Sequence, residues 1–149
     1  MTPEIDLKMM LAALRQAQLA YDAGEVPVGA IVALGDRIIG RGHNMTEALH
    51  DITAHAEMQA ITAATQTLGS KYLRDCTLYV TLEPCLMCAG AIAWSQVSRV
   101  VWGADDPRRG FSYLTRTDRP ALHPKTEITR GLLADDCLAL VRSFFASRR

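Results

Sequence analysis

The chain has 149 residues, with 16 basic and 16 acidic side chains and a hydrophobic fraction of 49%. This length and composition exclude intrinsic disorder and predict that residues 1–149 form a single globular domain. No apolar run reaches the roughly 18 residues of a membrane span, and the acidic N-terminus does not resemble a targeting segment. Four cysteines without an export signal are typical of free thiols or metal ligands, which predicts a cytoplasmic protein with no membrane partner.

The beginning of the chain predicts a helix followed by a β-hairpin. Thr-Pro at positions 2–3 is typical of a helix start, apolar residues then recur at helical spacing, and Gly24 marks the end. Residues 26–34 and 37–42 are rich in β-forming side chains and are joined by a Gly-Asp pair, which predicts two antiparallel strands.

The middle of the chain predicts a helix and a buried strand. A polar connection over 43–53 leads into a helix over 54–69, with Thr53 as its N-cap and Gly69 at its end. Residues 76–82 are too apolar for a strand with one solvated face, so they are predicted to form a central strand.

The remaining elements continue the alternation of helix and strand. A helix is predicted over 85–96, a strand over 97–104, an irregular loop over 105–124 and a short strand within 125–133. Residues 134–149 predict an amphipathic helix with acids in its first turn and arginines in its last, matching the helix dipole. The order predicts an α/β fold of three layers (α/β/α), with a mixed sheet of about five strands and helices on both faces.

A pair of cysteines raises the question of a metal site. Cys85 and Cys88 lie in the sequence TLEPCLMCAG, and a CxxC pair alone fits a redox pair, half of a structural zinc site or part of a catalytic one. A structural site needs a second close pair, whereas Cys76 and Cys137 stand alone and are predicted to be small core residues.

His55 offers the third ligand. It opens the helix that follows the hairpin, in the sequence TAHAE, 30 residues before Cys85. If both helices begin at the same edge of the sheet, His55, Cys85 and Cys88 face one ion. Three protein ligands leave a tetrahedral Zn²⁺ one open position, as a catalytic zinc requires.

Glu57 follows His55 by two residues, which separates the two side chains by about 200° around a helix. Both still reach a site beyond the helix N-terminus. One reading makes Glu57 a fourth ligand of a closed structural site. The functional reading keeps its carboxyl off the metal, where it transfers protons as the catalytic residue.

The HxE and PCxxC motifs are those of zinc nucleobase deaminases. With them, the blocks EVPVGAIV, HDITAHAE, CTLYVTLEPCLMCAGAI, RVVWGA and EITRGLLADDC resemble the cytidine deaminase-like superfamily, and within it the bacterial tRNA-specific adenosine deaminases. The resemblance implies one Zn²⁺ per subunit, conversion of a wobble adenosine to inosine in a tRNA anticodon stem-loop, and a homodimer.

The resemblance also implies substrate-binding residues. Asn44 matches a residue that binds the base, although it also fits a simple turn former. Phe144 and Phe145 match aromatic residues of the last helix that meet the anticodon loop, but adjacent helical residues point about 100° apart, so only one can face fully inward. The full set of expected substrate-binding residues, including one arginine chosen for its place in the basic loop, is Val28, Ala30, Asn44, Asp106, Arg108, Phe144 and Phe145.

The chain departs from this family where the substrate would be chosen. The loop over 105–124 carries Arg108, Arg109 and Tyr113, and Leu122-His123-Pro124 stands where LNH is usual. Basic residues with an interleaved aromatic side chain favour a looped-out RNA strand, whereas the net charge of zero does not. The alternatives are a deaminase of a free nucleobase or nucleoside, of the guanine or cytosine type, and, more remotely, a non-catalytic zinc-stabilised binding domain.

Overall fold

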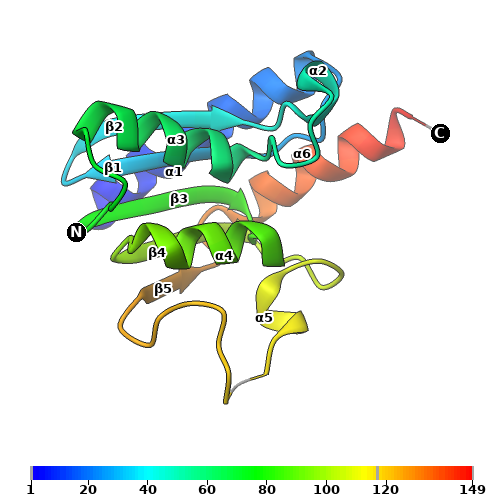
Figure 1. Cartoon of the computed structure of the whole chain (residues 1–149). Coiled ribbons are helices and arrows are strands. Elements are labelled where there is room, and N and C mark those ends of the chain that lie inside the picture. Colours follow the sequence, from blue (N-terminus) through cyan, green and yellow to red (C-terminus); the bar gives the residue numbers. More distant parts are fainter. Residues whose placement is uncertain (1, 117, 149) are drawn as a thin grey trace.

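A computed structural model of the chain describes residues 2–116 and 118–148. Within them a five-stranded sheet has the order β2-β1-β3-β4-β5 (Figure 1). The strands are β1 (Gly29–Leu34), β2 (Arg37–His43), β3 (Cys76–Leu82), β4 (Arg99–Ala104) and β5 (Glu127–Arg130). The helices are α1 (Pro3–Asp22), α2 (Thr46–Leu49), α3 (Ala56–Leu68), α4 (Leu86–Ser95), α5 (Phe111–Leu114) and α6 (Ala134–Ala146).

Helices cover both faces of this sheet, so the predicted three-layer fold is confirmed. Figure 1 shows α3 and α4 in front of the sheet, with α1 and α6 behind it. In the front layer, Ala60 of α3 and Ile92 of α4 pack in one cluster with Val80 of β3. Behind the sheet, Met10 of α1 and Cys137 of α6 belong to a second cluster. The isolated cysteines Cys76 and Cys137 are buried, as expected of core residues.

The directions of the strands bring the ends of four strands together on one side of the sheet. β1 pairs antiparallel with β2 and β3, while β4 runs parallel to β3 and β5. Gly29 therefore lies opposite His43, and Leu82 lies opposite Ala104. The carboxyl ends of β2, β3 and β4 meet the beginning of β1 at this edge. Ligands of open α/β sheets bind outside such carboxyl ends.

Two glycines of β2 allow α3 to lie directly on the sheet. A Cβ atom at Gly40 would lie 2.4 Å from the carbonyl oxygen of Ala60, and one at Gly42 would lie 2.4 Å from that of Ala56. A larger residue at either position would push the helix away. The close approach fixes the beginning of α3 at the edge where the strands end.

The order of the long elements agrees with the sequence, but some of their ends differ. Thr2 caps α1 through a hydrogen bond from the amide of Ile5, and Gly69 ends α3 with a positive φ of 65°. The expectation that Thr53 caps α3 is wrong: His55 is the N-cap residue, and the Thr53 hydroxyl donates instead to Asp51 at 2.7 Å.

Two further differences lie outside the long elements. α6 ends at Ala146 without a basic residue in its last turn, so Arg148 follows the helix instead of lying in its last turn, and Arg149 lies outside the described residues. The short helices α2 and α5 lie within segments that the sequence predicted as a polar connection and an irregular loop. Each is a single turn, too short to show a helical repeat of apolar residues. In the described part of the chain, no helix has the length and apolar character to cross a membrane.

Candidate active site

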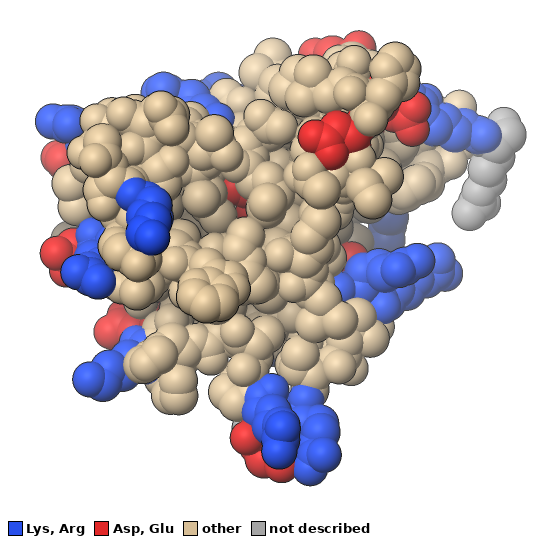
Figure 2. All heavy atoms as spheres, in the orientation of Figure 1, with Lys and Arg blue, Asp and Glu red and all other residues tan. Residues whose placement is uncertain are grey.

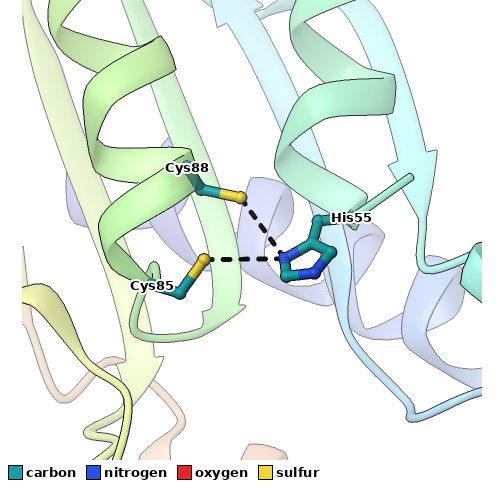
Figure 3. Close-up of side chains that lie close together, drawn as sticks. All are labelled: His55, Cys85 and Cys88. Carbon is teal, nitrogen blue, oxygen red and sulfur yellow. Dashed lines mark hydrogen bonds between the residues drawn. The ribbon is translucent and has the colours of Figure 1, made fainter. Parts of the chain in front are cut away.

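One imidazole and two thiols converge at the edge where the strands end. The Nδ1 atom of His55 lies 3.6 Å from the Sγ of Cys85 and 3.5 Å from the Sγ of Cys88 (Figure 3). The three donor atoms all lie within 4.8 Å of one another. Tetrahedral zinc with Zn–S of about 2.3 Å and Zn–N of about 2.0 Å separates nitrogen and sulfur ligands by about 3.5 Å. The donor set and its spacing therefore fit Zn²⁺, with a fourth position left for a non-protein ligand.

Two helix beginnings place these donors. His55 is the N-cap residue of α3, Cys85 is the N-cap residue of α4, and Cys88 lies one turn further along α4. Neither residue makes a side-chain capping hydrogen bond to its helix, so both donor atoms can turn toward a metal. The positive ends of the two helix dipoles also stabilise thiolate over thiol.

The two thiols share a proton unequally. Hydrogen bonds from Cys88 and His55 lower the pKa of Cys85 to about 4, against the cost of burial. The same interaction with Cys85, together with burial, raises the pKa of Cys88. The hydrogen bond to Cys85 also raises the pKa of His55. These surroundings favour the thiolate at Cys85, and binding of a metal ion favours deprotonation of Cys88 as well.

Glu57 lies in the first turn of α3 and is buried beside the three donors. Burial raises its pKa to about 7. Its carboxyl is not among the atoms of the donor cluster. This geometry supports the reading in which Glu57 faces the site without binding the metal. It also lines the pocket described next.

A pocket of about 450 Å³ opens above the donors. His55, Glu57 and Cys85 form its floor. Its apolar wall comes from Val26, Val28, Ile52 and Met87, and its polar wall comes from Asn44, Thr46, Asp106 and Arg109. A mostly apolar pocket with a few polar groups suits a flat heteroaromatic ring.

Three of the expected substrate-binding residues line this pocket: Val28, Asn44 and Asp106. The Asn44 amide donates to the carbonyl of Val26 and accepts from the amide of Thr46, both at 3.3 Å. Asn44 is therefore both a turn-forming residue and a wall residue. The two readings of this residue do not exclude each other.

The other expected substrate-binding residues lie away from the pocket wall. Ala30 is fully buried in the core between the sheet and α3, because it lies within β1 rather than before it. Arg108 is exposed but does not line the pocket. Phe144 is buried against Tyr21 at a ring separation of 5.7 Å, while Phe145 is half exposed. The two phenylalanines thus face different surroundings, as their spacing predicts, and neither lines the pocket.

The sequence did not identify several residues at the pocket. Arg109 was named only as part of the basic loop, with Arg108 chosen for the site, whereas in the structure Arg109 lines the pocket and Arg108 does not. The Asp106 carboxylate accepts from the amides of both arginines and turns the chain there. Ile52 is 83% exposed at the pocket, within a segment that otherwise reads as polar. Its one available signal was a large apolar side chain in a polar connection. Nothing in the sequence indicated that Glu25 and Glu83 would be almost fully buried, as both are in the structure.

A three-layer α/β fold with a His/Cys/Cys donor set, and a glutamate beside an open metal position, defines a zinc-dependent nucleobase deaminase. Residues 3–104 match the family described as cytidine and deoxycytidylate deaminase zinc-binding region. The chain belongs to this family, and its cofactor is zinc. It is accordingly a hydrolase, and the predicted relationship is confirmed.

Three relatives of the chain are deaminases that act on tRNA. The chain is 40% identical over 142 residues to the tRNA-specific adenosine deaminase of Bacillus subtilis, covering 94% of this chain and 88% of that protein. It is 39% identical over 142 residues to that of Agrobacterium fabrum, covering 94% and 93%. It is 41% identical over 162 residues to the chloroplastic tRNA(adenine(34)) deaminase of Arabidopsis thaliana, covering 97% of this chain but 12% of that protein.

Solved structures of two kinds of deaminase share the fold of this chain. A structure from a study of A-to-I editing by tRNA:A34 deaminases superposes with a TM-score of 0.82 at 37% identity, covering 89% of this chain and 98% of that one. A guanine deaminase from Nitrosomonas europaea superposes with a TM-score of 0.80 at 27% identity, covering 97% and 85%.

Proposed function

We propose that this enzyme converts the wobble adenosine of a tRNA anticodon loop to inosine by hydrolytic deamination. The observation that carries the proposal is the identity of about 40% across 94% of the chain to a tRNA-specific adenosine deaminase. The structure supports it with a donor set suited to zinc and a pocket large enough for one base. Water and adenosine give inosine and ammonia.

The chain's own side chains provide the proton transfers. We assign His55, Cys85 and Cys88 as the ligands that hold zinc, which when bound supplies a Lewis acid that makes water nucleophilic near neutral pH. Glu57 accepts the proton of the attacking water and passes it to the purine ring nitrogen as the C6–O bond forms. It then transfers the second proton to the departing amine. The position of Glu57, buried on the pocket floor beside the donors, suits this role.

The pocket walls would hold the base and its backbone. Asn44 presents its amide to the polar edge of the base, and Val28 packs against the ring face. Asp106 and Arg109 meet the nucleotide at the mouth, where a guanidinium suits a phosphate. An unpaired loop nucleotide costs little to extrude into such a pocket.

The proposal includes a homodimer formed through α4. This helix contains no charged residue, and a helix that is apolar on all sides is normally buried. Its Trp94 is nevertheless 83% exposed, with Leu86 and Met87 exposed on the same helix. Figure 2 shows few charged side chains over the middle of this face. A second copy presenting the same surface would bury it in an isologous interface, and Trp94→Glu should then shift sedimentation toward monomer.

We further propose that residues 1–149 form one domain that works in the cytoplasm. α1 and α6, from opposite ends of the sequence, contact the same face of the sheet. None of the four cysteines forms a disulfide, which suits a reducing compartment.

A second candidate function is deamination of guanine. It is favoured by the superposition with the guanine deaminase from Nitrosomonas europaea and by the replacement of LNH at 122–124. The experiment incubates zinc-loaded protein separately with an anticodon stem-loop carrying a wobble adenosine and with free adenine, guanine, cytosine and their nucleosides. Inosine in the stem-loop, with free bases unchanged, is the expected result. Conversion of guanine with the stem-loop untouched would overturn the tRNA proposal.

A further inference from the structure

The side chain of Glu83 is fully buried at the end of β3, two residues before Cys85. Such a carboxylate needs compensating donors. The nearest cation among the described residues is Arg130, whose Nη2 atom lies 3.9 Å from Oε1, too far for a direct hydrogen bond. The partners that satisfy Glu83 must therefore be sought in the loop that covers it.

Those partners belong to the segment 106–112. Oε1 of Glu83 accepts from the amide of Asp106 at 3.1 Å. Oε2 accepts from the amide of Ser112 at 3.0 Å and from its hydroxyl at 2.5 Å. One carboxylate thus holds both ends of this segment.

The middle of the segment is joined to the turn that carries the metal donors. The amide of Phe111 donates to the carbonyl of Pro84 at 2.9 Å, and Gly110 forms an isolated β-bridge with Cys85. A Cβ atom at Gly110 would lie 2.4 Å from the Cδ of Glu83. Only glycine lets the chain pass this close over the carboxylate.

The segment also forms one side of the pocket mouth. Its Asp106 and Arg109 line the pocket, and the Asp106 carboxylate accepts from the amides of Arg108 and Arg109 at 3.1 Å. The position of Arg109 is therefore set by a turn whose first amide is held by Glu83. Glu83 also lines the pocket, but its side chain is fully buried and its carboxylate already accepts from Asp106 and Ser112. It therefore acts through this turn rather than on the substrate.

We propose that Glu83 is a positioning residue: it fixes the segment 106–112 to the Cys85 turn, so that Asp106 and Arg109 stand in register with the zinc site. One side chain thereby sets where the recognition segment lies relative to the metal donors. The inference rests on the proposed function only for the identity of the substrate. The effect on the loop is independent of it.

The first test is amide hydrogen exchange in zinc-loaded wild type and Glu83→Gln. The amide group of glutamine replaces one accepting oxygen with a donor, so one loop contact is lost. Faster exchange confined to 106–112, with the first turns of α3 and α4 unchanged, is expected. Tyr79→Phe is the matched control, because it removes a partly buried hydrogen bond to Asp6 without touching this segment. Unchanged exchange at 106–112 in Glu83→Gln would overturn the proposal.

The second test measures kcat and KM for the anticodon stem-loop. Glu83→Gln is expected to raise KM a few-fold, as Arg109→Ala does, with kcat changed less and zinc content unchanged. The same change in an Arg109→Ala background should add little, because both act through one contact. Full additivity, or loss of zinc with KM unchanged, would make Glu83 merely structural and contradict the proposal.

A milder variant covers the case in which Glu83→Gln does not fold. Ser112→Ala removes the hydroxyl contact and leaves the carboxylate and both amides in place. It should show the same local increase in exchange, smaller in size, and its absence would overturn the proposal. If wild type leaves the stem-loop unconverted, the proposed substrate is wrong, whereas the exchange result still decides the role of Glu83.

Discussion

The floor and the mouth of the pocket are built in different ways. The floor comes from the first turns of two long helices, which place His55, Glu57 and Cys85 there and add Cys88 to the donor cluster. The mouth comes from irregular chain around two single-turn helices, α2 and α5. Regular backbone holds the floor, whereas side chains must hold the mouth.

Two buried carboxylates do this on opposite sides of the pocket. Glu25 accepts from the amides of Glu47 at 3.0 Å and Ala48 at 2.8 Å, which fastens α2 next to Asn44. Glu83 holds the segment 106–112 in the same manner. The comparison shows that the residues for the chemistry are placed by two helices, whereas the residues for substrate recognition are placed by loops that buried carboxylates hold. Changes at the floor should abolish turnover, and changes at the mouth should alter binding or stability.

The largest effect is expected at the metal donors. Cys88→Ser should weaken zinc binding more than about 100-fold. Mutation of a residue that only hydrogen-bonds to a metal ligand already lowers metal affinity about 10- to 100-fold. Turnover of the variant should fall to background. A chelator should abolish turnover of the wild type, and added zinc should restore it. Metal analysis of purified protein measures the loss. Cys76→Ala, a buried cysteine outside the site, is the control and should keep its zinc.

Glu57→Gln separates proton transfer from metal binding. The amide keeps the size of the side chain but cannot accept and release the proton, so kcat should fall about 10²- to 10⁴-fold. Zinc content should stay at that of wild type. Loss of the metal in this variant would mean that Glu57 is a fourth ligand of a closed site. Retained turnover would fit a zinc-stabilised binding domain instead of an enzyme.

At the mouth, Glu25→Gln is expected to act on stability. One oxygen that accepts an amide is replaced by a donor in a buried position, which should lower the free energy of unfolding by about 2 kcal/mol. Urea denaturation of the zinc-loaded protein measures this. Thr46→Ala removes only a longer contact to the same carboxylate, at 3.4 Å, and should cost less. Equal losses of unfolding free energy in the two variants would show that the amide contacts of Glu25 contribute little to stability.

The smallest effect is expected for the arginines of the mouth. Arg109→Ala should raise KM for the stem-loop a few-fold and reduce the slope of log KM against log salt by about 0.7, as for one lost phosphate contact. Arg108→Ala is the matched comparison, and it should change both quantities less because Arg108 lies off the pocket wall. A stronger effect at Arg108 would restore the expectation from sequence.

The sequence by itself determined the order of the long elements, the buried central strand and the metal donors. These rest on local regularities: apolar side chains at helical or strand spacing, and two cysteines one helical turn apart. The beginning of a helix at His55 could be inferred to within a few residues, although its cap could not. Here Thr53 forms a turn with Asp51 and leaves the N-cap position to the histidine.

Only the tertiary structure decided the mouth of the pocket. It selected Arg109 over Arg108, placed Ala30 in the core, and made Glu25 and Glu83 the supports of two loops. The amides that these carboxylates bind lie 22 to 29 positions away along the chain. Every residue except proline offers the same backbone N–H. The partners of a buried carboxylate therefore leave no mark in the sequence, and only the packed fold reveals them.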